Sequence, residues 1–306
     1  MSYDLLIIGG GPAGLSAGLY ASRANLKNLI LEKGDAGGQI ASTSEVDNYP
    51  GSIKNATGPT LSMRMKEQCV EFGSEFKKEE FIDLKKDGKI FKVKTDKDEY
   101  EAKTVIIATG ADPKEIGCKG EREYRGMGVS YCATCDGFFF RDLTVAVVGG
   151  GDSALEEGMF LTKFAKKVYI IHRRDELRAV KSIQDKAFAN NKIEFVFDSV
   201  VEEIKGDGVV NGITVKNVKT GELTDMAVDG VFVYVGYKPN SAKFRDFVEL
   251  DETGFIIGTE EMTTTTAGLF VAGDIRKKML KQVITAAADG AIASVSAEKY
   301  VAENFE

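Results

Sequence analysis

The sequence contains no tryptophan, a single histidine (His172) and only four cysteines among its 306 residues. Four cysteines are too few for the disulfide framework of a secreted protein of this length. We therefore expect a reducing, cytoplasmic setting in which any disulfide would be catalytic. No apolar run approaches the about 18 residues that a membrane-spanning helix needs. The apolar residues 5–8 lack the basic segment that precedes the core of a signal peptide, so we expect neither a leader nor a membrane segment.

An excess of positive charge is also missing. The formal net charge of −7 argues against a nucleic-acid-binding surface. Hydrophobic residues make up 43% and charged residues 28% of the chain, as in soluble proteins with a full core. A chain of this length is about twice the size of a usual domain, which favours two domains.

A glycine loop follows the first apolar run. Residues 4–8 have the composition of a buried parallel strand, and residues 15–24 have a helical period. Between them, Gly9 permits a tight turn, Gly11 lets the backbone approach a pyrophosphate, and Gly14 lets the helix pack on the strand. A pyrophosphate would then lie at the helix N-terminus, where free N–H groups favour anions. The predicted phosphate-binding residues are Gly9, Gly11, Pro12, Ala13 and Gly14.

The second expected strand, at 29–31, ends at Glu32. An acid at this spacing from the glycines is placed to bind ribose hydroxyls. Because a carboxylate would repel a 2′-phosphate, this site suits FAD or NAD rather than NADP. The alternative is a chance glycine loop with a surface glutamate, which the combination of strand, helix and acid disfavours.

The rest of the first half alternates turns and regular elements. The turn-rich segment 37–51 is too long for an ordinary connection and is interpreted as a binding loop. Cys69 is expected to be a buried structural thiol within a helix. The expected elements are a helix at 60–76, an antiparallel hairpin within 81–101, and a buried strand at 104–108 that closes at Thr109 and Gly110.

A second glycine loop begins after an expected strand at 143–148 and continues into a helix to about residue 165. His172 follows the next strand, at 167–171, and stands as far from Ala154 as Glu32 stands from Gly14. Where the first unit has an acid, this one has basic residues, and guanidinium groups are suited to a 2′-phosphate. A solvated basic turn is the alternative. The sequence thus predicts NADPH here, bound by Gly149, Gly151, Asp152, Ser153, Ala154, His172, Arg173, Arg174 and Arg178.

The later elements lead back to the first domain. Asp274 follows a strand within 268–274 and would bind a ribityl hydroxyl or cap the next helix. Further strands are expected at 193–197, 209–217 and 231–235, and a helix at 281–299. The predicted fold is α/β, with two Rossmann-like three-layer nucleotide-binding domains, the second inserted into the first. The FAD-binding domain would comprise residues 1–112 and 244–306, and the NADPH-binding domain residues 113–243.

Two cysteines three residues apart, Cys132 and Cys135, lie between the two glycine loops and are followed by Asp136. Such a pair is typical of half a zinc site, a redox dithiol or two unrelated thiols. No second Cys/His pair exists to complete a zinc site, so we expect no metal. The position between two nucleotide sites favours a redox dithiol.

From end to end, the chain resembles the low-molecular-weight, bacterial-type thioredoxin reductases. The motifs that carry the resemblance are Gly9–Gly14, Cys132-Ala133-Thr134-Cys135-Asp136, Gly149–Ala154 with Glu156-Glu157, His172-Arg173-Arg174-Asp175 with Arg178, and Gly273-Asp274 with Gln282. The resemblance implies a homodimer in which electrons pass from NADPH to FAD, to the Cys132–Cys135 disulfide and then to oxidised thioredoxin. It also implies that Cys135 faces the flavin and that Cys132 attacks thioredoxin.

The resemblance also extends the flavin site. The implied FAD contacts, together with those from the glycine loop and Glu32, are Gly38, Gln39, Asn48, Thr109, Gly110, Gly273, Asp274, Lys281, Gln282 and Val283. Lys281 stands where the family usually has arginine, which keeps the charge but loses the planar fork.

Thiolates must be formed and protonated during such a cycle, so an acid–base group is needed near the dithiol. The one histidine lies at the NADPH site, which leaves Asp136 as the candidate; a plain turn residue is the alternative. A dithiol packed on a flavin cannot reach a protein disulfide at the same time. We therefore expect the middle domain to rotate about the connections near 112–117 and 240–245.

Other functions compete with this one. A reductase of the same fold could serve another thioredoxin-like protein, and a ferredoxin-driven reductase would leave Arg173 and Arg174 without a purpose. A flavin-bound redox sensor would hold reduced flavin without turnover. The sequence shows neither a second redox motif at its C-terminus nor a thioredoxin-like N-terminal extension, which argues against an alkyl hydroperoxide reductase flavoprotein.

Overall fold

The computed structural model describes residues 2–43, 46, 48–54 and 56–305. The chain forms two compact units, unit 1 (Met1–Asp112 with Lys238–Glu306) and unit 2 (Pro113–Tyr237). It passes between them along β7 (Ala111–Pro113) and β16 (Tyr237–Pro239), which pair as a two-stranded sheet. We predicted the return to the first unit near residue 244, and the structure places it at Lys238, where β16 pairs with β7.

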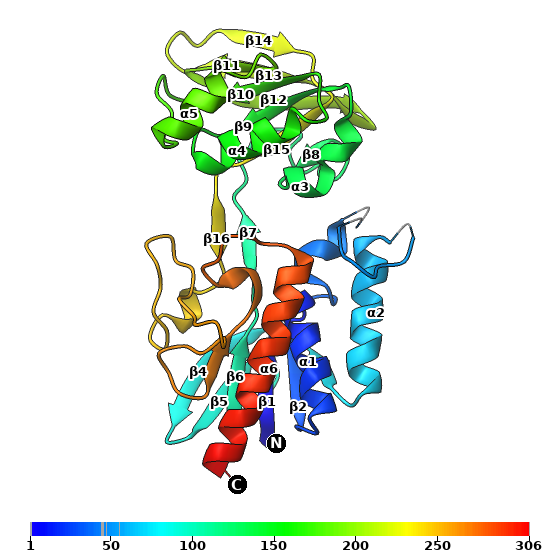
Figure 1. The fold of residues 1–306 in the computed structure, drawn as a ribbon, viewed down its shortest axis with the longest axis vertical. Helices are drawn as coiled ribbons and strands as arrows, with labels where there is room; N and C mark the ends of the chain where they lie inside the picture. The colour runs from blue at the N-terminus through cyan, green and yellow to red at the C-terminus, as the bar shows by residue number, and fades with distance from the viewer. Residues whose placement is uncertain (1, 44–45, 47, 55, 306) are drawn as a thin grey trace. The chain divides into compact units, whose positions relative to one another are not determined.

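Unit 1 is built on a sheet with the order β3-β2-β1-β6-β5-β4 (Figure 1). Strand β6 changes partner along its length, because its residues 99–102 pair antiparallel with β5 and its residues 105–107 pair parallel with β17. The strands are β1 (Ser2–Ile8), β2 (Asn28–Glu32), β3 (Glu75–Lys78), β4 (Phe81–Asp87), β5 (Ile90–Thr95), β6 (Glu99–Ile107) and β17 (Leu269–Val271). The helices are α1 (Pro12–Arg23), α2 (Gly58–Glu71) and α6 (Val283–Phe305), with 3-10 turns η1 (Gly38–Ser42), η3 (Ala242–Phe244) and η4 (Gly273–Ile275).

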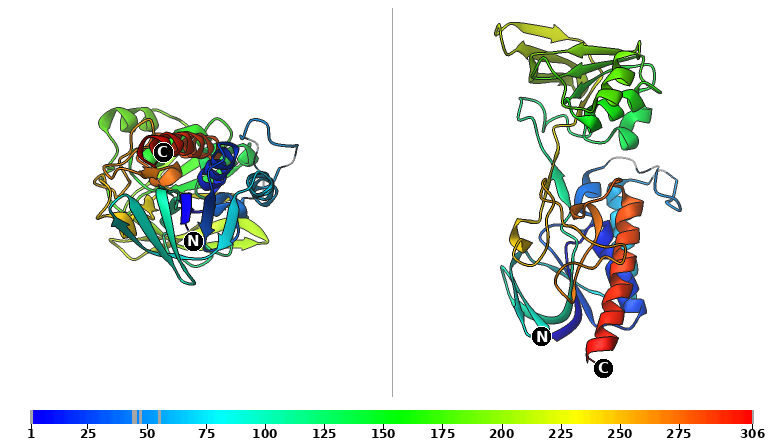
Figure 2. Two further views of the ribbon diagram at one scale, coloured as in Figure 1. Left: turned by 90° about the horizontal axis from the view of Figure 1, so that it is seen from below. Right: turned by 60° about the vertical axis from the view of Figure 1, so that its left-hand side comes forward.

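Both faces of the parallel strands in unit 1 are buried. On β1, Leu5 and Ile7 join the core under α1 and α6, which lie side by side on the sheet (Figures 1 and 2). Leu6 and Ile8 point into the second core, with Phe91 of the β4–β5 hairpin. Because neither face meets water, the strand needs an unbroken apolar run rather than an alternating one.

Unit 2 repeats this layering with a parallel sheet of order β11-β10-β9-β15-β8. Val145 and Val147 of β9 pack in the core that contains residues of α3, α4 and α5, while Ala146 and Val148 pack against the antiparallel sheet β12-β13-β14. The strands are β8 (Val129–Ser130), β9 (Thr144–Val148), β10 (Lys167–Ile171), β11 (Ile193–Val196), β12 (Ser199–Asp207), β13 (Val209–Asn217), β14 (Leu223–Met226) and β15 (Gly230–Val233). The helices are α3 (Ala133–Asp136), α4 (Asp152–Leu161) and α5 (Lys181–Phe188), with the 3-10 turn η2 (Gly137–Phe140). The predicted α/β class with two three-layer Rossmann-like units is confirmed.

Several predicted elements need correction. The helix expected at 60–76 ends at Glu71, because Gly73 turns the chain with φ of 108° and the following residues form β3 beside β2. Strands β12 and β14 were not predicted.

Other boundaries differ less. Helix α4 ends at Leu161 rather than near 165, and α6 runs to Phe305 rather than 299. Cys69 is fully buried in α2, as predicted. Within the predicted binding loop at 37–51, positions 44, 45 and 47 lie outside the described residues.

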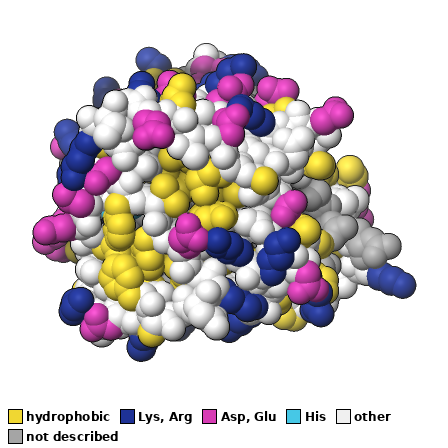
Figure 3. All heavy atoms as spheres, turned by 90° about the horizontal axis from the view of Figure 1, so that it is seen from above, with side chains coloured by type: hydrophobic (Ala, Val, Ile, Leu, Met, Phe, Trp, Pro, Cys, Tyr) yellow, Lys and Arg dark blue, Asp and Glu magenta, His cyan; other side chains and the backbone are white. Residues whose placement is uncertain are grey.

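Within the described ranges, no helix combines the length and the apolar character that crossing a membrane would require. On the face drawn in Figure 3, lysine and arginine side chains are interspersed with acidic ones rather than gathered into one patch.

Candidate active site

The first glycine loop connects β1 to α1. Gly9 has φ of 114°, and a side chain there would meet the backbone oxygen of Ala108 at 2.3 Å. A Cβ at Gly14 would lie 1.9 Å from the oxygen of Gly9, so only glycine lets the helix start this close to the strand. Helix α1 begins at Pro12, with Ala13 buried beneath the loop. The loop therefore has the geometry that a pyrophosphate site requires.

Glu32 lies beside this loop, at the end of β2. One carboxylate oxygen accepts a hydrogen bond from the backbone N–H of Gly10 at 2.7 Å, and the other accepts from Gly34 at 2.9 Å. Each oxygen keeps a further lone pair for a hydroxyl donor. The structure thus brings the predicted ribose-binding acid to the predicted phosphate loop.

The carboxyl ends of β6 and β17 reach the same edge of the sheet as the end of β1. Thr109 follows β6 and donates its hydroxyl to the Asn240 oxygen at 3.1 Å, and Gly110 follows it with φ of 65°. Asp274 follows β17 in η4, and its Oδ1 atom is buried without a hydrogen-bond partner among the described residues. Burial raises the pKa of Asp274, although Lys278 and Lys281 act against this shift.

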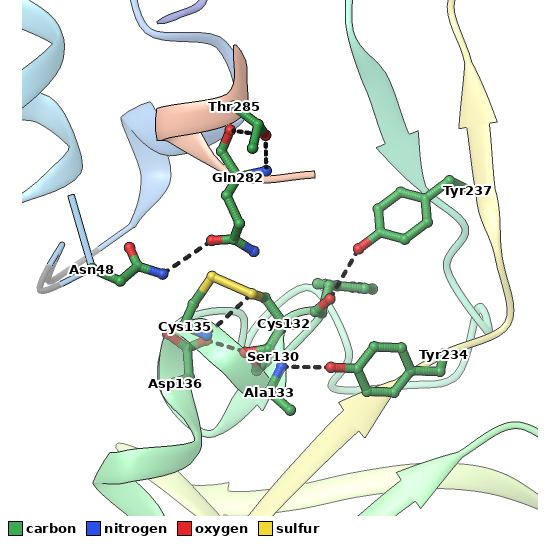
Figure 4. The surroundings of a disulfide bond; sticks show 11 residues. Asn48, Ser130, Cys132, Ala133, Cys135, Asp136, Tyr234, Tyr237, Gln282 and Thr285 are labelled. Carbon is green, nitrogen blue, oxygen red and sulfur yellow. Dashed lines mark hydrogen bonds between the residues drawn. A yellow bond between two sulfur atoms is a disulfide. The ribbon is translucent and has the colours of Figure 1, made fainter. Parts of the chain in front are cut away.

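Other predicted FAD contacts surround this edge of unit 1. Gln39, in η1 with Gly38, donates to Asp112 at 2.5 Å. Asn48 donates to the side-chain oxygen of Gln282 at 3.0 Å, just before α6 begins at Val283 (Figure 4). Lys281 is half-buried, with its ammonium 4.1 Å from the centre of the Phe255 ring.

A buried charge cluster that sequence reasoning missed supports the Gly273–Asp274 turn. Asp289 of α6 is 5% exposed and accepts the backbone N–H of Gly273 at 3.0 Å. Its carboxylate also pairs with Arg276 at 3.2 Å and with Lys278 at 3.0 Å. The carboxylate therefore holds the backbone of the turn and forms ion pairs with two largely buried cations.

We expect Asp289→Ala to destabilise unit 1 by about 3–5 kcal/mol, because it leaves two cations buried without this partner. Urea unfolding of the purified protein measures the effect. The matched control is Asp35→Ala, which removes the exposed ion pair with Lys78 and should leave the midpoint unchanged. An Asp289→Ala protein as stable as the control variant would contradict a supporting role for this cluster.

The second glycine loop connects β9 to α4 in unit 2. Gly149 has φ of 155°, and no heavy atom outside its neighbours lies within 4 Å of a Cβ built at Gly151. Helix α4 begins at Asp152, which accepts the backbone N–H of Val180 at 2.7 Å. Ser153 is exposed in the first turn and Ala154 is fully buried under it.

The basic turn after β10 is tied to this loop, since the N–H of Arg178 donates to the Gly150 oxygen at 2.7 Å. His172 is 5% exposed, and its ring lies so close to Gly150 that a Cβ there would be 2.3 Å from Nδ1. Burial and the nearby arginines lower the pKa of His172. The exposed cations are Arg173, Arg174 and Arg178, so the histidine packs beneath the loop while the arginines face solvent.

The dithiol lies in unit 2 at a short helical turn. Cys132 and Cys135 form a disulfide, with Cα atoms 5.3 Å apart. Cys132 caps α3, and its sulfur accepts the N–H of Cys135 at 3.1 Å. Phe138 and Phe139, which follow directly, are 58% and 43% exposed. The disulfide therefore adjoins an apolar surface.

Asp136 ends the same turn and accepts a hydrogen bond from the Ser130 hydroxyl at 2.5 Å (Figure 4). Burial raises the pKa of Asp136, and the Ser130 hydrogen bond offsets part of that shift. A carboxyl group next to the disulfide thus holds its proton more tightly than an aspartate in water.

Sequence reasoning missed four further residues around the disulfide. Ser130 also accepts the N–H of Cys132 at 3.0 Å, and Tyr237 donates to the Tyr131 oxygen at 3.1 Å. Tyr234 accepts the N–H of Ala133, and its hydroxyl interacts electrostatically with Glu157 of α4. Only Glu157 had a signal in the sequence, as part of the acidic pair after the second glycine loop.

Comparisons with known proteins place this arrangement in a family. The pyridine nucleotide-disulphide oxidoreductase family matches residues 3–290. A thioredoxin reductase of Peptoclostridium acidaminophilum is 56% identical, over 99% of this chain and 98% of its own length. The thioredoxin reductase of Bacillus subtilis is 48% identical, over 98% of this chain and 95% of its own length.

Solved structures agree. The crystal structure of thioredoxin reductase from Streptococcus pyogenes is similar to this chain with a TM-score of 0.95 and 48% identity, over 99% of each chain. That of Giardia duodenalis has a TM-score of 0.93 and 37% identity, over 98% of this chain and 99% of its own. This chain therefore belongs to the pyridine nucleotide-disulphide oxidoreductase family, among its thioredoxin reductases.

Proposed function

We propose that this protein is an NADPH-dependent flavoenzyme that reduces the disulfide of thioredoxin. One observation carries the proposal: the Cys132–Cys135 disulfide shares unit 2 with a glycine loop that is flanked by arginines. A second glycine loop, flanked by the acid Glu32, lies in unit 1. A dithiol combined with two different dinucleotide sites fits electron transfer from one nucleotide, through another, to a disulfide.

The residues of unit 1 fit FAD. The buried Oδ1 of Asp274 has an ion pair with Lys278 at 3.6 Å but no hydrogen-bond partner among the described residues, and a ribityl hydroxyl is a suitable donor. The space over Gly11 is open, since a Cβ there would approach nothing closer than 3.9 Å. We assign FAD to Gly9, Gly11, Pro12, Ala13, Gly14, Glu32, Gly38, Gln39, Asn48, Thr109, Gly110, Gly273, Asp274, Lys281, Gln282 and Val283.

The residues of unit 2 fit NADPH. Three exposed guanidinium groups stand where the first unit carries its acid, and they can bind a 2′-phosphate through charge-assisted hydrogen bonds. We assign direct contacts to Gly149, Gly151, Asp152, Ser153, Arg173, Arg174 and Arg178. Ala154 and His172 are buried, so they act by shaping the loop from beneath.

Bound FAD would supply a two-electron relay between a nicotinamide and the disulfide. Cys132 and Cys135 accept two electrons, and their sulfur–sulfur bond breaks. The thiolate of Cys132 then attacks the thioredoxin disulfide, forms a mixed disulfide and releases one thioredoxin thiolate. Cys135 attacks the Cys132 sulfur, which restores the intramolecular disulfide and releases the second thiolate. The order of the two cysteines follows the resemblance to the family.

Asp136 is the proposed proton donor and acceptor. It lies in the same turn as both sulfurs, and its raised pKa keeps the carboxyl protonated to a higher pH than usual. A protonated carboxyl can give its proton to a departing thiolate. Phe138 and Phe139 offer an exposed apolar surface next to the disulfide on which a protein substrate can dock.

Asp136→Asn tests this role through opposite effects on rate and stability. The pKa of Asp136 is raised from 3.8, so the folded protein holds this proton more tightly and loses stability as pH rises from 3.8 through the raised value. At pH 7 the amide removes the cost of a buried charge, so thermal unfolding should occur at an equal or higher temperature. The kcat for thioredoxin should fall about 10²-fold, and the part of its pH profile that reflects titration of Asp136 should disappear. A variant with unchanged kcat would exclude Asp136 as the acid–base group.

We further propose that the protein is a cytoplasmic homodimer. Within each chain, unit 1 and unit 2 would change their relative orientation during turnover. Analytical ultracentrifugation tests the dimer, and a monomer at working concentration would contradict it. Fluorescence energy transfer between dyes on the two units should change when NADPH and thioredoxin are added. A constant signal during turnover would contradict the movement.

A panel of electron acceptors separates this function from its alternatives. We expect the purified protein to consume NADPH with oxidised thioredoxin, and at least about 10²-fold more slowly with a glutaredoxin or a peroxiredoxin. Faster NADPH consumption with glutaredoxin or peroxiredoxin than with thioredoxin would identify that protein as the partner and leave the proposed disulfide reduction in place. A redox sensor would hold reduced flavin and consume no NADPH with any acceptor.

A further inference from the structure

Two tyrosines hold the backbone on either side of Cys132. The hydroxyl of Tyr234 accepts the N–H of Ala133, in the peptide that follows Cys132, at 2.5 Å. The hydroxyl of Tyr237 donates to the oxygen of Tyr131, in the peptide that precedes Cys132, at 3.1 Å. Both tyrosines come from one segment of unit 2, since Tyr234 directly follows β15 and Tyr237 begins β16 (Figure 4).

The Tyr234 hydroxyl lies near a second polar group. A phenol has one proton to donate and lone pairs to accept. Tyr234 accepts from Ala133 and interacts electrostatically with Glu157 of α4, whose Oε2 atom is buried and has no hydrogen-bond partner among the described residues. Ala133 is 1% exposed, so water cannot replace the tyrosine as the acceptor of its N–H.

We propose that Tyr234 and Tyr237 are positioning residues that hold Cys132 in place for disulfide formation and for attack on thioredoxin. With both flanking peptide groups anchored, the backbone of Cys132 keeps one conformation whether or not its sulfur is bonded to Cys135. Small displacements of a nucleophile lower rates steeply, so holding the backbone matters more than the small area of contact suggests. The second half of this proposal rests on the proposed function.

The variants are Tyr234→Phe, Tyr237→Phe and the double variant, which keep the rings and remove the hydroxyls. Tyr124→Phe is the matched control, because its hydroxyl also donates to a backbone oxygen of unit 2, that of Gly206 at 2.9 Å, away from the disulfide. The first measurement is the equilibrium constant for forming the Cys132–Cys135 disulfide in glutathione buffers. The second is the rate at which the pre-reduced protein reduces thioredoxin.

Each single variant should lower the equilibrium constant and the rate about three- to tenfold, the effect expected for one hydrogen bond. The double variant should lose more than the product of the two single losses, because each hydroxyl holds the turn when the other is absent. Tyr124→Phe should change neither quantity. The KM for thioredoxin should stay within about twofold of the wild-type value in all variants, since the apolar surface around Phe138 is untouched.

An unchanged equilibrium constant in the double variant, or an equal fall in Tyr124→Phe, would overturn the proposal. Failure of the wild-type protein to reduce thioredoxin would instead refute the proposed function. The glutathione equilibrium would still test the positioning role in that case, because it requires neither NADPH nor thioredoxin.

Discussion

Replacing Cys135 by serine should abolish NADPH-driven reduction of thioredoxin, with a fall in kcat of at least about 10³-fold. The structure pairs Cys135 with Cys132, so the variant has no disulfide to accept electrons and none to restore after attack on the substrate. Reduction of the bound flavin by NADPH should persist, since that step does not use the thiols. Stopped-flow absorbance of the flavin and steady-state turnover measure the two steps separately.

Cys118→Ser is the control for this substitution. Cys118 lies in the same unit, is half-buried, and burial raises the pKa of its thiol to about 11, so little thiolate forms at neutral pH. Its variant should turn over at the wild-type rate. Thioredoxin reduction that survives in Cys135→Ser, or is lost in Cys118→Ser, would show that electrons take another path.

Removing the guanidinium groups of Arg173 and Arg174 should lower kcat/KM for NADPH by about 10²- to 10³-fold and leave that for NADH within a few-fold. Each charge-assisted hydrogen bond to the 2′-phosphate contributes about 1.5–3 kcal/mol, and every 1.4 kcal/mol is about tenfold. NADH has no such phosphate, so it loses only long-range attraction. Initial rates with both nucleotides, at two salt concentrations, measure the change in preference.

Arg122→Ala serves as the control for Arg173→Ala and Arg174→Ala. Its side chain is 83% exposed in unit 2, where it pairs with Glu115. Arg122→Ala removes one positive charge, as each of the two test substitutions does, but it should not alter nucleotide preference. If the Arg173/Arg174 double variant kept its preference for NADPH over NADH, the basic turn would not be the selector.

The layering of both units could be predicted from the sequence because the parallel strands are buried on two faces. Strands β10 and β13 were predicted with the bounds that the structure has, since Lys167–Ile171 and Val209–Asn217 are dense in β-branched residues. The first two residues of strand β3 (Glu75–Lys78) fall inside the predicted helix at 60–76 because the burial of this strand is slight, and only its pairing with β2 reveals it. Tertiary pairing of this kind leaves no periodic signal in a short polar segment.

The candidate site divides in the same way. Glycine loops, Glu32 and the dithiol could be found from spacing, because backbone geometry and phosphate chemistry restrict which residues can stand there. Tyr234, Tyr237 and Asp289 could not be predicted, since each acts through one hydrogen bond to a distant peptide group. His172 is predicted to contact NADPH, and because it is buried against Gly150 the role that we propose for it is to shape the loop.

The most direct test of the account is a balance of electrons in the purified protein, with NADPH consumption and thioredoxin thiols counted in the same reaction. The account predicts a flavin-containing protein that forms two thioredoxin thiols for each NADPH consumed and needs thioredoxin for sustained turnover. NADPH consumption without thioredoxin thiols would contradict it. So would a flavin that NADPH does not reduce, because the basic turn of unit 2 would then have another ligand.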